Sequence, residues 1–75
     1  MSDSPVLTRI EGRTGILSFN RARVMNAFDS ALVNATSAAM AEMAADDRVL
    51  AIVVHGEGRC FSAGFDMKES AARGL

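Results

Sequence analysis

The sequence predicts an α/β fold, in which a β-hairpin, a helix and a buried parallel strand follow one another in one small domain. Three patterns support this fold class. Two short β-favouring runs flank a glycine-containing turn, apolar residues then recur at helical spacing, and an unbroken apolar run follows at residues 49–54. The order strand, helix, strand is that of a βαβ crossover, which brings two parallel strands into one sheet.

The length and composition of the chain narrow the classes of function. The 75 residues suit one small domain or part of a larger one, and 49% of them are hydrophobic, as in a packed protein. Eight basic residues against nine acidic ones give a net charge of -1, which excludes a broad basic surface for nucleic acid or anionic lipid. One cysteine excludes a disulfide framework, so we expect the apolar elements to need a partner surface.

The sequence shows no membrane anchor or targeting signal. Residues 1–5 are short and polar, and the longest apolar run, residues 49–54, is far below membrane-spanning length. We therefore expect a cytoplasmic protein without membrane association. The free Cys60 agrees with a reducing compartment.

The first expected element is a β-hairpin. Residues 6–10 and 16–19 are its β-favouring runs, and Gly12 and Gly15 between them are expected to supply the positive φ that a tight turn needs. Residues 20–27 follow. They are too polar for a strand and lack helical periodicity, so we expect a loop that presents two arginines, Arg21 and Arg23.

A helix is expected from Asp29 to about Ala45. Asp29 or Ser30 can accept a hydrogen bond from the first-turn N–H groups. Residues 46–48 are charged and interrupt the helix, and residues 49–54 lack alternation, so this strand is expected to be buried on both faces inside a parallel sheet. The helix residues that recur at steps of three or four and form its apolar face are Phe28, Leu32, Ala35, Ala39 and Met43.

After that strand we expect a turn at residues 56–58, a short extended piece at residues 60–62 and the start of a second helix at residues 67–69. Residues 62–64 are small, so the backbone here can approach a ligand closely. The N–H groups at the start of a helix can also stabilise an oxyanion. The competing interpretation is a plain helix start capped by Asp66.

Three other chemistries fit these residues less well. A dinucleotide-binding turn needs glycine at the position of Phe61. A nucleophile elbow centred on Ser62 has Cys60 in place of its first glycine, and the single histidine, His55, precedes the serine instead of following it. A metal site would have only His55 and Cys60, and a lone histidine ending a strand is more often a hydrogen-bonded edge residue.

Three segments, in order along nearly the whole chain, resemble the crotonase (enoyl-CoA hydratase/isomerase) superfamily. Phe19-Asn20-Arg21 and Val24-Met25-Asn26-Ala27-Phe28 are similar to the family's Leu-Asn-Arg-Pro and Leu-Asn-Ala-Leu segments. The stretch from Arg48 to Gly56 resembles its Val-Arg-Val-Val-Val-Leu-Thr-Gly strand. The stretch from Arg59 to Glu69 resembles its Phe-Ser-Ala-Gly-Ala-Asp-Leu-Lys-Glu signature.

The resemblance implies a coenzyme A thioester enzyme, with residues 1–75 as the N-terminal part of a single crotonase-like domain, a spiral of β-β-α turns. Two backbone N–H groups of such enzymes bind the thioester oxygen while an enolate-like anion forms, and by position the Phe65 N–H is one of them. Coenzyme A enters as part of the substrate, so no separate cofactor or metal is expected. The complete protein is expected to be a homotrimer or hexamer. The residues implied to line the coenzyme A path are Arg23, Val24, Phe61, Ala63, Gly64, Asp66 and Met67.

Three departures from the family pattern affect the expected activity. Ala22 stands where the family usually has proline, and Phe65 stands where alanine is commonest, which places a bulky ring beside the acyl group. The family's second oxyanion donor and its acid/base carboxylates follow the segment that this chain matches. We therefore expect half of an oxyanion hole and part of a coenzyme A site, with little activity alone. The alternative is a non-catalytic acyl-CoA-binding or subunit-interaction module.

Overall fold

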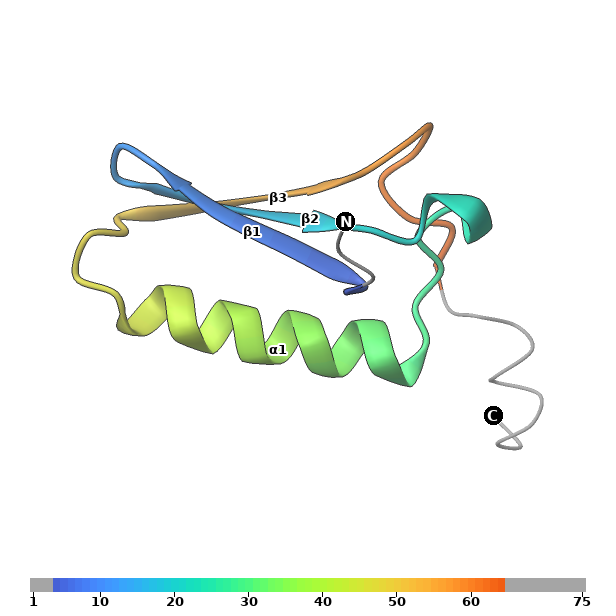
Figure 1. The fold of residues 1–75 in the computed structure, drawn as a ribbon, viewed down its shortest axis with the longest axis horizontal. Helices are drawn as coiled ribbons and strands as arrows, with labels where there is room; N and C mark the ends of the chain where they lie inside the picture. The colour runs from blue at the N-terminus through green and yellow to red at the C-terminus, as the bar shows by residue number, and fades with distance from the viewer. Residues whose placement is uncertain (1–3, 65–75) are drawn as a thin grey trace.

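A computed structural model describes residues 4–64, which form a three-stranded sheet with one helix along one face (Figure 1). The strands are β1 (Val6–Glu11), β2 (Thr14–Phe19) and β3 (Ala51–Gly56), and the helix is α1 (Ser30–Ala45). A single 3-10 turn, η1 (Ala22–Val24), interrupts the loop between β2 and α1. The α/β fold class is confirmed, whereas the predicted start of a second helix at residues 67–69 lies outside the described residues.

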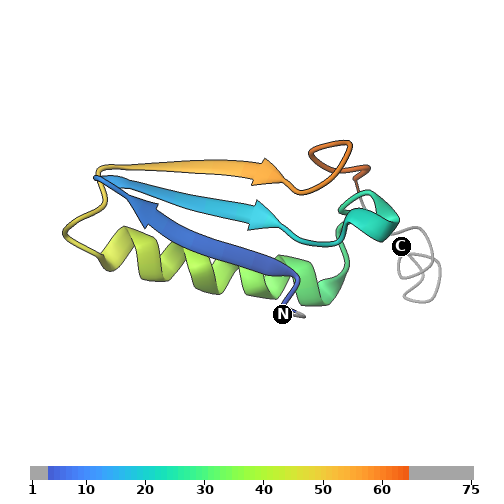
Figure 2. The same ribbon diagram turned by 45° about the horizontal axis from the view of Figure 1, so that its top comes forward.

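The sheet has the order β1-β2-β3 and mixes the two kinds of strand pairing. β1 pairs antiparallel with β2, and β2 pairs parallel with β3, so the predicted hairpin and βαβ crossover are both confirmed. In Figure 2 the arrows of β2 and β3 point the same way and that of β1 points back. The carboxyl ends of the two parallel strands therefore lie at one edge of the sheet.

The hairpin turn is shorter than predicted, and its two glycines have different roles. Glu11 pairs with Thr14, so Gly12 and Arg13 alone make the turn, and Gly12 has the positive φ, +61°, that a type II′ turn requires there. Gly15 does not have a positive φ, so that expectation is wrong. It lies within β2, where a Cβ would meet the Met43 sulfur at 2.9 Å, and its missing side chain lets α1 pack closely.

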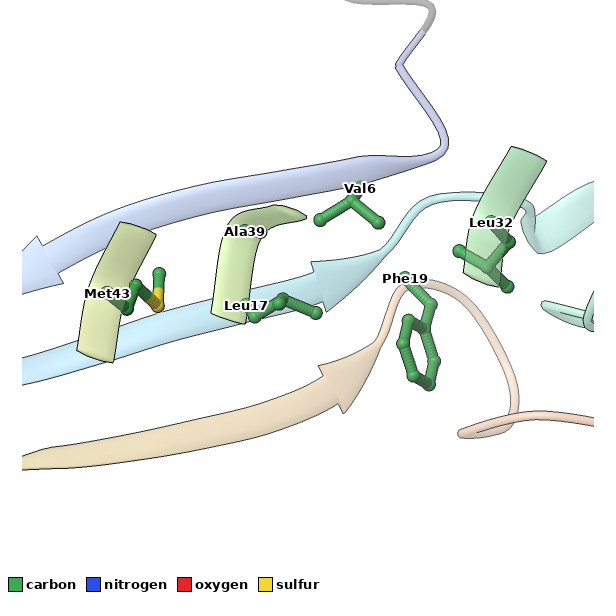
Figure 3. Close-up of a cluster of buried hydrophobic side chains, with 6 residues drawn as sticks. All are labelled: Val6, Leu17, Phe19, Leu32, Ala39 and Met43. Carbon is green, nitrogen blue, oxygen red and sulfur yellow. The ribbon is translucent and has the colours of Figure 1, made fainter. Parts of the chain in front are cut away.

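The helix begins where the sequence predicts, and its apolar face forms the core. The Asp29 carboxylate caps α1 by accepting a hydrogen bond of 2.8 Å from the Leu32 N–H. Figure 3 shows the buried side chains of α1 facing those of the sheet. Phe28 and Ala35 pack against this cluster, so the predicted apolar face is confirmed in full. The buried core residues are Val6, Leu17, Phe19, Leu32, Ala39 and Met43.

The prediction that β3 is buried on both faces is wrong for the described part of the chain. Ile52 and Val54 pack toward the core, but Val53, between them, is 48% exposed. β3 is the last strand in the sheet order, and no described residues cover the face opposite α1. The unbroken apolar run therefore indicated the parallel pairing correctly and the local burial incorrectly.

The segments around β3 also differ from expectation. Residues 60–62 form a bend and irregular backbone instead of an extended strand-like piece. Before β3, Asp46 ends α1 and accepts hydrogen bonds from the Arg48 backbone and guanidinium. The side-chain hydrogen bond from Arg48 lowers the pKa of Asp46 to about 2. Within residues 4–64, α1 and the shorter 3-10 turn both fall short of the length and apolarity that a membrane-spanning helix needs.

The core can be tested at Leu32, whose side chain is fully buried beneath the sheet. We expect Leu32→Ala to lower the free energy of unfolding by about 2–5 kcal/mol, because it removes buried methyl groups and leaves a cavity. Urea denaturation followed by circular dichroism measures this loss. The matched control is Leu50→Ala, since Leu50 is 71% exposed and its truncation should change stability by less than about 0.5 kcal/mol. Equal effects of the two changes would contradict this packing.

A second test uses Gly56, the last residue of β3. A Cβ there would collide with the Phe61 carbonyl oxygen and come within 2.7 Å of both the Asn26 amide nitrogen and the Cys60 carbonyl oxygen. We expect Gly56→Ala to cost about 1–3 kcal/mol, because backbone atoms cannot yield as a flexible side chain can. Gly15→Ala should cost less, since it meets the movable end of Met43. Thermal unfolding of both variants checks the order, and the reverse order would contradict it.

Candidate functional site

Two loops meet at the edge of the sheet where the parallel strands end. The first, which we call the arginine loop, is residues 20–28 after β2, and the second, which we call the small-residue loop, is residues 57–64 after β3. Ligands of open α/β sheets commonly bind outside the carboxyl ends of the strands. Figure 1 shows η1 and the segment after β3 side by side at this edge, and the hydrogen bonds below join them.

Backbone hydrogen bonds join the ends of the two loops. The Ala63 N–H donates to the Met25 carbonyl at 2.8 Å, and the Phe28 N–H donates to the Gly64 carbonyl at 2.7 Å. The Ser62 hydroxyl donates to the Asn26 carbonyl at 2.8 Å. These contacts bring together segments more than 30 positions apart in the chain.

The side chain of Asn26 lies between the loops and is fully buried. Its amide nitrogen donates to the Glu57 and Cys60 carbonyls, both at 2.9 Å, and its amide oxygen accepts from the Arg21 N–H at 2.8 Å. Asn26 lies in the segment that resembles the family's Leu-Asn-Ala-Leu, but sequence reasoning did not name it as a candidate site residue. The signal that could have found it is an asparagine in a polar loop, because asparagine tolerates the left-handed backbone that Asn26 adopts here, with φ of +54°.

The two arginines of the arginine loop differ in role. The Arg21 guanidinium is held inside the loop, where it donates to the Ala27 carbonyl and lies 3.3 Å from the Asp29 carboxylate. Arg23 is exposed on η1. A hollow of about 450 Å³ opens beside it, lined by Pro5, Asn20, Arg21, Ala22, Arg23, Val24 and Ala31. This hollow offers a partly positive surface next to the exposed, apolar Val24.

The backbone donors of the small-residue loop are already engaged in the described part. The Ala63 N–H is bonded to Met25, and the Gly64 N–H donates to the Ser62 hydroxyl at 3.0 Å. Gly64 has φ of +93°, a conformation that favours glycine. The Ala63 N–H is therefore used to join the two loops, and the Gly64 N–H is used within the small-residue loop.

Phe61 links this loop to the core while staying half exposed. Its ring lies 5.0 Å from that of Phe19, centroid to centroid, and the Phe19 ring lies 5.4 Å from that of Phe28 in an edge-to-face contact. Phe61 nevertheless keeps 53% of its surface exposed. It can therefore present an apolar face to a ligand without leaving its contact with the core.

The structure brings five of the predicted site residues to this one edge: Arg23, Val24, Phe61, Ala63 and Gly64. The Ala22 position, which departs from the family's proline, lies against the small-residue loop, because a Cβ at Gly58 would come within 2.8 Å of the Ala22 methyl. The other three predicted residues, Phe65, Asp66 and Met67, lie outside the described residues.

The side chains considered for a nucleophile elbow or a metal site make other contacts in the structure. The Ser62 hydroxyl is committed to Asn26 and Gly64, while the His55 ring pairs with the Ser18 hydroxyl at 2.7 Å and faces Glu57 at 3.8 Å. The Ser62 hydroxyl therefore stabilises the turn, as in the interpretation preferred over the nucleophile elbow, and His55 is a hydrogen-bonded strand residue. The Cys60 thiol donates to the Met25 carbonyl at 3.5 Å, and residues 4–64 hold no cluster of three metal-ligating side chains.

Comparisons with known proteins agree with the resemblance seen in the motifs. Residues 14–74 match the model of the enoyl-CoA hydratase/isomerase family. A probable enoyl-CoA hydratase from Rhizobium meliloti is 38% identical over 69 residues, which are 92% of this chain and 27% of that protein. A 4-chlorobenzoyl coenzyme A dehalogenase-2 from Arthrobacter sp is 43% identical over 53 residues, which are 71% of this chain and 19% of that protein.

Solved structures show the same fold. A structure of an enoyl CoA hydratase/isomerase (crotonase) from Legionella pneumophila superposes with a TM-score of 0.90 at 32% identity, covering 97% of this chain and 28% of that one. The chain thus spans between 19% and 28% of the length of these three proteins. On the family match and these likenesses, the chain belongs to the enoyl-CoA hydratase/isomerase family, the crotonase superfamily, and corresponds to its N-terminal portion.

Proposed function

We propose that the chain carries the first part of an acyl-CoA site, with half of an oxyanion hole and part of the coenzyme A path. The observation that carries this proposal is the joining of the arginine loop to the small-residue loop at the carboxyl edge of β2 and β3. A coenzyme A thioester is both anionic and apolar along its length. A site for it therefore needs a cation and apolar walls close together, and Arg23, Val24 and Phe61 supply them at this edge.

The coenzyme A part of the proposal rests on the exposed groups beside the hollow. Arg23 would meet a phosphate of the ligand, since a guanidinium pairs well with phosphate oxygens. Val24 and Phe61 are about half exposed and would contact the less polar pantetheine arm. Ala63 and Gly64 have little or no side chain, so the ligand could pass close to their backbone. Asp66 and Met67 would continue the same path.

The oxyanion part of the proposal assigns one donor to the Phe65 N–H. This assignment comes from the resemblance of residues 59–69 to the family's signature segment. It is compatible with the described loop, in which the N–H groups of Ala63 and Gly64 are already hydrogen-bonded. A backbone donor at this position would stabilise the negative charge that develops on the thioester oxygen as an enolate-like anion forms.

One oxyanion donor without acid/base groups would give little turnover in the 75-residue chain. Losing one donor typically costs about 10²–10³ in rate, and losing general acid/base catalysis about 10²–10⁴ more. Among the carboxylates near the two loops, that of Asp29 caps α1 and pairs with Arg21, and that of Glu57 faces His55. The Asp29 carboxylate is thus already engaged, whereas the Glu57 side chain is 41% exposed and lies beside His55 without a hydrogen bond to it.

The reaction of the complete protein is proposed only as a class. The relatives include probable hydratases and a dehalogenase of a coenzyme A thioester. A phenylalanine at position 65 would place a ring beside the acyl group, which disfavours plain hydration of a short enoyl-CoA and leaves hydrolysis, isomerisation or dehalogenation. Coenzyme A would be part of the substrate, with no further cofactor, and the complete protein would be a cytoplasmic homotrimer or hexamer.

The second candidate function is a non-catalytic acyl-CoA-binding or subunit-interaction module. It is favoured by the apolar side chains that the described residues leave exposed on and beside β3, Leu50 at 71% and Val53 at 48%. Such a surface suits burial against another chain. This function and the first share the coenzyme A site, and they differ in whether the chain takes part in turnover.

Calorimetric titration with coenzyme A and with a short acyl-CoA tests the binding proposal. We expect both ligands to bind, and Arg23→Ala to weaken binding about fivefold, the effect of losing roughly 1 kcal/mol from an exposed charge pair. The matched control is Arg13→Ala, because Arg13 is also exposed but lies in the hairpin turn at the opposite end of β2. Absence of binding by a folded chain would leave only the interaction module.

A steady-state assay with crotonyl-CoA tests the activity proposal. We expect the rate of hydration by the 75-residue chain to stay close to the uncatalysed rate, because general acid/base groups and a second donor are needed for turnover. A complete hydratase of the family, assayed at the same concentration, serves as the positive control. Turnover by the chain at a comparable rate would overturn the proposal that it carries only half of the oxyanion hole and no acid/base group.

A further inference from the structure

We propose that Asn26 is a positioning residue, whose side-chain amide holds the small-residue loop against the arginine loop so that both can contact one coenzyme A molecule. This inference rests on the proposed function, since it concerns the affinity of the same site. Asn26 itself is fully buried and would not touch the ligand. It would act through the backbone of the residues that do.

The hydrogen-bonding capacity of the Asn26 side chain is matched to this position. Both hydrogens of its amide nitrogen are used, one on the Glu57 carbonyl and one on the Cys60 carbonyl, each at 2.9 Å. Its amide oxygen accepts from the Arg21 N–H at 2.8 Å. One side chain thus fixes backbone groups at the start of the arginine loop and at two points of the small-residue loop.

The backbone at this position restricts which residue can stand there. Met25 and Asn26 both have φ of +54°, in the left-handed region that asparagine tolerates better than most residues other than glycine. Glycine would keep this conformation and lose the amide. Aspartate would keep the size of the side chain and lose both donors. The two changes therefore separate the contribution of the backbone conformation from that of the hydrogen bonds.

Loss of the amide should loosen the small-residue loop without unfolding the domain. The Glu57 and Cys60 carbonyls would lose a shared donor in a partly buried place, which is unfavourable. The Ala63–Met25 and Phe28–Gly64 backbone bonds and the core under α1 do not involve the amide. The main effect of the substitution would therefore be a less well-held position of residues 57–64, and the rest of the domain would keep its fold.

Asn26→Asp adds a readout that a general loss of packing would not produce. Its carboxylate would face two carbonyl oxygens, and only its protonated form could donate to one of them, so the pKa of the new carboxyl would rise. Arg21, Glu57 and Cys60 are the titratable residues whose backbone it would contact. Coenzyme A affinity relative to the wild type should then recover in part as the pH falls, and be lost as it rises through that pKa.

The test combines calorimetry with coenzyme A and amide hydrogen exchange followed by NMR. At neutral pH we expect Asn26→Asp and Asn26→Gly to weaken coenzyme A binding about tenfold and to speed exchange at Ala63 and Gly64, while both variants keep a cooperative unfolding transition. Toward about pH 5, Asn26→Asp should regain part of its affinity and Asn26→Gly should not. Asn34→Ala, at an exposed asparagine of α1, is the matched control and should change neither measurement.

Each outcome decides one of the two proposals. If the wild type binds no coenzyme A, the proposed function fails, and the exchange rates still test the role of Asn26. Unchanged affinity and unchanged exchange in both variants would overturn the positioning role. Loss of cooperative unfolding in both variants would overturn it too, since Asn26 would then maintain the whole fold instead of one loop. An identical pH dependence in the two variants would show that the amide donors are not what matters.

Discussion

The parallel pairing of β2 with β3 is the constraint on which the rest of the molecule depends. It sets Phe19 opposite Gly56, so that the chain leaves both strands at the same edge of the sheet. One further bond, from the Glu57 N–H to the Phe19 carbonyl at 2.8 Å, continues the ladder into the small-residue loop. Two loops that are distant in sequence then start from adjacent points. The crossover helix makes this pairing possible, because parallel strands need a connection of this length and α1 covers the sheet on its way.

The elements that sequence reasoning predicted correctly are those governed by local periodicity. The apolar spacing from Phe28 to Met43 and the cap at Asp29 lie within one helix, so neighbouring residues determine them. The predictions that β3 is buried on both faces and that Gly15 has a positive φ were wrong, because both features depend on residues distant in the sequence. Gly15 owes its role to Met43 on the helix, and Val53 is exposed because no described residues cover the face of the sheet opposite α1. No pattern along the chain contains either relation.

In the candidate site, too, the sequence predicted features that depend on single residues and missed those that depend on distant contacts. Small residues at 62–64 and a family resemblance were enough to select Ala63 and Gly64, because the small size of alanine and glycine can be read from the sequence alone. Their neighbours nevertheless determine what these residues can do. Their N–H groups are engaged by Met25 and Ser62, and the loop is fixed by an asparagine 31 and 34 positions from its two acceptors. Hydrogen bonds over such separations leave no periodic trace in a sequence, so the structure was needed to find them.

The exposed position of β3 has a consequence for contacts with other chains. Its six residues carry no acidic side chain, lysine, arginine or proline, and within residues 4–64 only one of its two edges is paired. Such an edge can add a strand from any neighbouring chain, and natural proteins usually protect it with charge, a bulge or a covering segment.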